Sequence, residues 1–165
     1  MMARLCYDLL MEKGRDALAA VERHEVTPAL EDVVEATIYL SGLGFENGGL
    51  AAAHAVNDGF AQEPQAHGMY HGEKVAFGTL VQLVLEKAPQ EELEQVLAFL
   101  RDTGLPLTLA QLGVKEIVPE TLKKVAEAAV VPTQSTKNLR ADITAQEVYD
   151  AILEADRIGR DYLAR

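Results

Sequence analysis

Apolar residues recur at helical spacing along almost the whole chain, and this periodicity limits the fold more than any other feature of the sequence. Between residues 3 and 22, Cys6, Leu10, Ala17 and Val21 lie on one side of a predicted helix, at spacings of four, seven and four. No segment shows the alternation of apolar and polar residues that is typical of a strand. The sequence therefore predicts an all-α fold, a helical bundle.

Prolines mark the start of several predicted helices. Thr27 and Pro28 have the order of a cap followed by a first turn, and the helix they open carries Leu30, Val33, Val34 and Ile38. The glycines of "SGLGFENGG", residues 41–49, are expected to stop it. Pro89 and Pro119 open two further helices in the same way, and the first of these should bury Leu93, Val96, Leu97 and Leu100 and end at Thr103-Gly104.

The clearest helix is the last one. Thr144 and Glu147 have the spacing of a capping box, in which each side chain accepts a hydrogen bond from the backbone of the other residue. Apolar and small residues then follow at spacings of four, three, four and three: Val148, Ile152, Ala155, Gly159 and Tyr162. Residues 132–143 are polar and begin with a proline, so they predict a loop.

Length, charge and cysteine content restrict the class of protein. A chain of 165 residues can bury a real core, so we expect a single domain over residues 1–165. A net charge of -11 argues against nucleic acid and anionic membranes as partners, because both would repel the chain. The longest apolar run, residues 75–85, is too short to span a bilayer. Cys6, the single cysteine, and the absence of a secretory signal at the start favour a cytoplasmic protein.

Three of the four histidines fall within residues 54–71. His54 lies in "GLAAAHAV", on a helix that "NGGL" is expected to begin, and His71 stands at the head of the next helix. A histidine on an apolar face is often a core residue bonded to a carbonyl group. Two consecutive antiparallel helices would also bring His54 and His71 to a common point, where neutral imidazoles bind a divalent metal. Both readings stay open, because none of Asp58, Glu46 and Glu73 is an obvious third ligand.

The stretches "YLSGLGFENGGLAAAHAVNDGF" and "HGMYHGEKVAFGTLVQLVLE" closely resemble the C-terminal half of bacterial glycerol dehydrogenases, of the iron-containing alcohol dehydrogenase superfamily. The likeness extends to "ALEDVVEATIYLSG", "GLPLTLAQLGV" and "EVYDAILEADRIGRDYL". It implies an all-helical metal-binding domain, which in the complete enzyme packs beside an N-terminal α/β domain that holds NAD. It also implies zinc as the metal and glycerol, oxidised to dihydroxyacetone, as the substrate.

The same resemblance assigns roles to individual residues. His54 and His71 match metal ligands, and Phe45 matches an aromatic residue that lines the substrate pocket. His67 is expected to be a loop residue near the site. Asn57 and Asp58 depart from the "HAVHNG" pattern of the family and should alter hydrogen bonding around the metal.

Two parts of the family pattern have no match in the chain: the aspartate that is the third metal ligand, and the NAD-binding half. The chain is therefore expected to be a truncated glycerol dehydrogenase, inactive alone, with an incomplete zinc site and with no catalytic or NAD-binding residue of its own. A separately encoded NAD-binding half is one expected partner, and homo-oligomers are another. The alternative is a helical oligomerisation or interaction relic that binds metal weakly or not at all.

Overall fold

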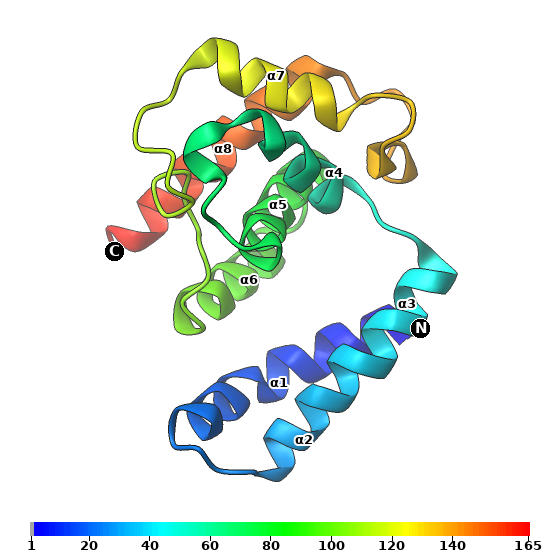
Figure 1. Ribbon diagram of the computed structural model, residues 1–165, viewed down its shortest axis with the longest axis vertical. Coiled ribbons are helices and arrows are strands. Elements are labelled where there is room, and N and C mark those ends of the chain that lie inside the picture. Colours follow the sequence, from blue (N-terminus) through cyan, green and yellow to red (C-terminus); the bar gives the residue numbers. More distant parts are fainter. Residues whose placement is uncertain (1) are drawn as a thin grey trace. The chain divides into compact units, whose positions relative to one another are not determined.

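The structure is a computed structural model, and it describes residues 2–165. Every regular element in this range is a helix (Figure 1), so the predicted all-α fold is confirmed. None of the helices within the described range is both long and apolar enough to cross a bilayer. The chain divides into two compact units, Met1–Gly49 and Leu50–Arg165, called here the first and the second unit. Whether they unfold together, as one domain would, stays a prediction.

The first unit is a helical hairpin. Helix α1 (Met2–Glu22) packs against α2 (Pro28–Glu35) and α3 (Ser41–Gly48), and a π-helical turn, η1 (Ala36–Leu40), joins α2 to α3 without a break. The Thr27 hydroxyl caps α2 by accepting the N–H of Leu30 at 3.3 Å, as predicted. The described residues buried in this unit are all small: Cys6, Ala17, Ala20, Ala36 and Gly44.

The glycines of residues 41–49 end the helix as predicted, but only the last of them does so. The helix runs through Gly42 and Gly44 and ends only where Gly49 adopts a positive φ of 73°. A glycine inside a helix costs about 1 kcal/mol relative to alanine, which neighbouring turns can offset, whereas a left-handed residue cannot continue the helix. The position of the stop therefore depends on backbone conformation, which the residue type alone did not show.

The second unit contains α4 (Ala52–Gly59), α5 (His71–Glu86), α6 (Gln90–Asp102), α7 (Pro119–Ala129) and α8 (Ala145–Leu163), with short 3-10 turns η2 (Phe60–Gln62), η3 (Pro64–Ala66) and η4 (Ser135–Asn138). Helix α4 packs on α5 and α7, and α8 packs on the same two helices. Large side chains fill the space between them. The largest fully buried apolar ones are Phe60, Phe77, Leu80, Leu97, Leu107, Leu109, Leu112, Leu122, Ile152, Val56 and Val81.

The predicted starts of α6, α7 and α8 are confirmed. Pro89 directly precedes α6, and Pro119 is the first residue of α7. The capping box of α8 is complete: the N–H of Glu147 donates to the Thr144 hydroxyl at 3.2 Å, and the N–H of Thr144 donates to the Glu147 carboxylate at 2.8 Å. The residues predicted to face inward from α6 and the first four apolar or small positions of α8 are buried.

Candidate metal centre

His54 lies in the first turn of α4. The helix begins at Ala52, so "NGGL" is the end of α3 and the connection after it, and the prediction that it opens the histidine's helix is wrong. His54 is only partly buried, although Ala52, Ala53 and Ala55 around it are buried. These small side chains leave the imidazole as the one large group at the start of α4.

His71 is the first residue of α5 and is exposed. The carboxylate of Glu73, two residues later, accepts the N–H of Tyr70 at 2.7 Å. Glu73 therefore satisfies a free backbone donor at the start of the helix. The contact that the structure gives Glu73 is thus with the backbone at the helix start.

The two imidazole rings lie close together in the structure. Their centres are 5.6 Å apart and their planes are inclined by 50°. A zinc ion bonded to a ring nitrogen at about 2.0–2.1 Å lies about 3 Å from the centre of that ring, so two imidazoles on one tetrahedral ion have centres about 5 Å apart. The spacing of His54 and His71 thus fits two ligands of a single ion.

The surroundings of His54 favour its neutral form. Burial lowers the pKa of His54 below its ordinary value, and the neighbouring His71 lowers it further, while the nearby carboxylate of Asp58 acts in the opposite direction. A neutral imidazole is the form that offers a free lone pair to a metal. The lowered pKa of His54 and the spacing of the two rings are therefore both compatible with two imidazole ligands on one metal ion.

Neither Asp58 nor His67 completes the site in this structure. The two carboxylate oxygens of Asp58 accept hydrogen bonds from the amides of Asn57, at 3.0 Å, and Gln134, at 3.2 Å. His67 is exposed on the connection between η3 and α5, and its Nε2 lies 3.0 Å from the carbonyl oxygen of Ala61. Within residues 2–165, no group of three His, Cys, Asp or Glu side chains is placed to hold a metal. Among the described residues, the structure therefore brings His54 and His71 together without a third such side chain beside them.

The loop between α7 and α8 holds the segment that leads into α4. The hydroxyl of Ser135 donates to the Ala51 carbonyl oxygen at 2.7 Å, and the amide of Asn138 donates to the Leu50 carbonyl oxygen at 2.8 Å. Sequence reasoning missed these contacts and placed only a loop here. They join residues more than eighty positions apart, and no local pattern signals such a pairing.

Phe45, the expected substrate-pocket residue, lies on α3 in the first unit, and its side chain is 49% exposed. Glu46 follows it and is also exposed. The structure gives no contact that assigns either residue to a site. The role of Phe45 stays a prediction.

No protein-family model matches the chain. A glycerol dehydrogenase of Escherichia coli O6:H1 is 56% identical over 162 residues, which make up 98% of this chain and 44% of that protein. A glycerol dehydrogenase of Pseudomonas putida is 49% identical over the same shares of the two chains. The crystal structure of a probable glycerol dehydrogenase from Sinorhizobium meliloti superposes with a TM-score of 0.93 at 45% identity, covering 97% of this chain and 46% of that one.

The fold and these likenesses place the chain among homologues of dehydrogenases. It is a homologue of the C-terminal portion of glycerol dehydrogenases, and it spans less than half the length of the curated relatives it matches.

Proposed function

We propose that the chain is the metal- and substrate-binding part of a zinc- and NAD-dependent enzyme that oxidises glycerol to dihydroxyacetone. The observation that carries the proposal is the 5.6 Å approach of His54 and His71 in a chain homologous to glycerol dehydrogenases. The capped start of α5 and the hydrogen-bonded segment before α4 support it, because both hold the helix ends that carry these histidines.

His54, His71 and Phe45 have different roles in this proposal. His54 and His71 would each hold one zinc ion through a ring-nitrogen lone pair. Zinc, when bound, supplies Lewis-acid chemistry that lowers the pKa of a coordinated alcohol. Phe45 limits the shape of the glycerol site. The groups that bind NAD, and a further metal ligand, are contributed by residues outside this chain.

A chimera tests the proposal. The 162 residues of the Escherichia coli O6:H1 relative that match this chain are replaced by their counterparts here. We expect the chimera to reduce NAD in the presence of glycerol and zinc, and His54→Ala and His71→Ala to abolish the reaction and weaken zinc binding. A folded chimera that binds zinc and NAD but leaves glycerol unoxidised would contradict the proposed activity.

The isolated chain should behave differently from the chimera. We expect it to bind zinc weakly through its two imidazoles, since each missing ligand removes bond energy and geometric definition. We also expect it neither to bind NAD nor to oxidise glycerol. Calorimetry with zinc and with NAD separates these expectations, and saturable binding of NAD would overturn the second.

Phe45 has a test of its own in the same chimera. Phe45→Ala should raise the KM for glycerol while zinc affinity stays unchanged, because the side chain is proposed to touch substrate and not metal. Phe45→Tyr keeps an aromatic ring and serves as the matched control. An unchanged KM in Phe45→Ala would remove the residue from the site.

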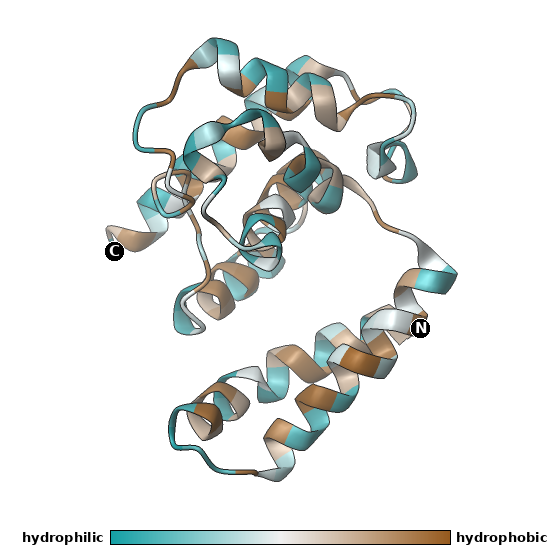
Figure 2. Cartoon of the chain, in the orientation of Figure 1, coloured by the Kyte–Doolittle hydropathy of each residue, from teal (hydrophilic) through white to brown (hydrophobic). Residues whose placement is uncertain are grey.

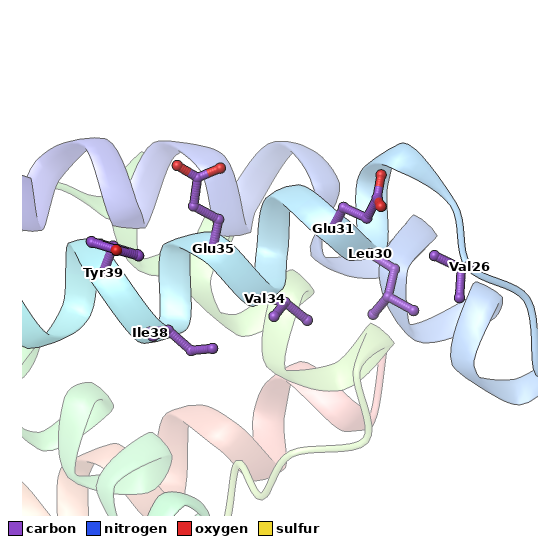
Figure 3. Close-up of a pocket in the computed structure, with 7 residues that line it drawn as sticks. All are labelled: Val26, Leu30, Glu31, Val34, Glu35, Ile38 and Tyr39. Atoms are coloured by element: carbon purple, nitrogen blue, oxygen red, sulfur yellow. The ribbon is translucent and has the colours of Figure 1, made fainter.

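A second function, self-association, is favoured by one apolar surface. A groove of about 400 Å³ runs along α2 and η1, lined by Val26, Leu30, Glu31, Val34, Glu35, Ile38 and Tyr39. Figure 3 shows Leu30, Val34 and Ile38 projecting from the same side of the helix. Ile38 is 67% exposed and Tyr39 is 64% exposed. Exposed apolar surface of this kind favours contact with another protein surface.

We propose that a second copy of the chain covers this groove. Sedimentation of the purified chain should then show oligomers that Ile38→Glu dissociates, because a carboxylate cannot be buried there unpaired. Glu31→Gln, at the edge of the same groove, is the control and should leave the oligomer intact. A wild-type chain that stays monomeric at high concentration would contradict this second function.

A further inference from the structure

Helix α4 begins without a capping side chain of its own. The residue before its first turn is Ala51, which carries no hydrogen-bonding side chain, so the first N–H groups of the helix need partners from elsewhere. One partner comes from α5: the side-chain oxygen of Gln82 accepts the N–H of Ala53 at 3.1 Å. The acceptor for the start of α4 is thus 29 residues away in sequence.

The Gln82 amide is fixed at both ends. Its oxygen faces the N–H of Ala53, and its nitrogen donates to the carboxylate of Glu86, one turn further along α5, at 2.8 Å. A backbone N–H can only donate and a carboxylate can only accept, so these two partners determine which way the amide points. Gln82 is therefore held as an acceptor for α4.

Gly78, one turn before Gln82, meets the other polar group of Ala53. A Cβ atom placed on Gly78 would lie closer than 3.0 Å to the carbonyl oxygen of Ala53, a separation that real Cβ atoms essentially never show. The backbones of α4 and α5 approach this closely only because residue 78 has no side chain. Gln82 and Gly78 thus contact the N–H and the C=O of the same residue, which directly precedes His54.

The same face of α5 carries His71. Seven residues separate His71 from Gly78 and four separate Gly78 from Gln82, and both intervals return to one side of a helix. We propose that Gly78 and Gln82 are positioning residues that fix the start of α4 against α5 and thereby set the separation of the His54 and His71 rings. The inference rests on the proposed role of these histidines as zinc ligands.

If Gly78 and Gln82 only supported the packing of the fold, any equally close backbone contact would affect zinc binding as much as theirs does. Gly159 provides the control for this alternative. Gly159 on α8 approaches the carbonyl oxygen of Leu107 as closely as Gly78 approaches that of Ala53. No histidine lies on α8. Gly159→Ala therefore disturbs a similarly close backbone contact, between α8 and the segment that follows α6, away from the start of α4.

The experiment measures zinc affinity of the full chain by calorimetry, well below the Tm of each variant. Gln82→Met keeps the length of the side chain but removes the acceptor, and Gly78→Ala forces the two helices apart. Both should weaken zinc binding by about tenfold or more, in the range found when groups that orient a metal ligand are removed. Glu86→Gln, which keeps the oxygen of Gln82, should bind zinc as the wild type does. The double variant Gln82→Glu/Glu86→Gln also keeps an acceptor oxygen at position 82, so it should bind zinc as the wild type does.

Proton NMR of the metal-free chain provides a second readout. Cross-relaxation between the ring protons of His54 and His71 should be present in the wild type and in Glu86→Gln, and lost in Gln82→Met and Gly78→Ala. Gly159→Ala should lower the Tm yet retain both the cross-relaxation and the zinc affinity. If Gln82→Met and Gly78→Ala behave like Gly159→Ala, the positioning role is overturned. If the wild type binds no zinc, the proposed function fails, and the ring contact still decides the positioning role.

Discussion

The two units of this chain bury very different side chains. In the first unit the buried residues are small, and ten large apolar side chains are exposed, against five in the second unit among the described residues. The second unit contains all the largest fully buried side chains, including Phe60 and Phe77, whose rings meet edge to face at 6.1 Å. Figure 2 shows brown, apolar residues along α1 and α2. Helical amphipathicity alone thus does not reveal how much of a helix is covered.

The difference has a physical consequence. Burial of apolar area provides most of the stabilisation of a fold, at about 25 cal/mol per Å². A hairpin whose buried residues are chiefly alanines gains little from it, and fewer than 50 residues form a marginal unit in any case. The second unit has the core, and it also carries His54 and His71. The first unit exposes apolar side chains, and the second unit holds both histidines on helices that share a core of large side chains.

The largest expected effect comes from separating the units. Residues 50–165 expressed alone should stay helical and unfold cooperatively, because their large buried side chains contact one another. Residues 2–49 alone should lose most of their helix. Circular dichroism with thermal melting measures both. A fragment 2–49 that is fully helical and melts cooperatively as a monomer would break the comparison.

Core truncation should show the same contrast on a smaller scale. Phe77→Ala removes a fully buried ring from α5 and should lower the free energy of unfolding by about 3–5 kcal/mol. In the dilute monomer, Val34→Ala removes an exposed side chain from α2 and should change it by less than about 0.5 kcal/mol; coverage of the groove by a second copy would raise this cost. Urea unfolding gives both values. A cost for Val34→Ala above that range would mean that the groove of the first unit is covered in solution.

The local signals explain which parts of this fold were predictable. Thr27, Pro119 and the Thr144–Glu147 pair act on their own first turns, so the sequence located these helix starts correctly. Helical spacing also placed Val21 and Ile38 on helices, but it did not show that they are 51% and 67% exposed. Whether an apolar helix face is buried depends on what packs against it, and the spacing of residues along that helix does not contain this information.

The candidate site also has features that the sequence predicted and features that it did not. Two successive helices predicted that His54 and His71 meet, and the structure brings their rings together, while their role as ligands stays a prediction. Gln82, Gly78 and Ser135 were not predicted to support the start of α4. Their contacts join residues that are distant in sequence, and no spacing of glutamine, glycine or serine along the chain predicts such contacts.

The smallest expected effect concerns acid. The N–H of Thr144 and then the guanidinium of Arg140 lower the pKa of Glu147 to about 2, from an ordinary 4.5. Because the unfolded chain binds this proton at higher pH, the stabilisation from Glu147 is complete above about pH 4.5 and is lost as pH falls toward 2. Glu147→Gln should therefore flatten the fall in Tm over this range. Equal slopes in variant and wild type would show that the cap contributes nothing to the pH dependence of the second unit.

The central claim is that His54 and His71 bind a single zinc ion within the second unit. Zinc X-ray absorption of the chain, loaded with less than one equivalent of the metal, tests it most directly. We predict two imidazole ligands per zinc at about 2.0–2.1 Å in the wild type, and one in His54→Ala and in His71→Ala. A spectrum that is identical in the wild type and in the double variant would contradict the claim, because zinc would then be bound elsewhere.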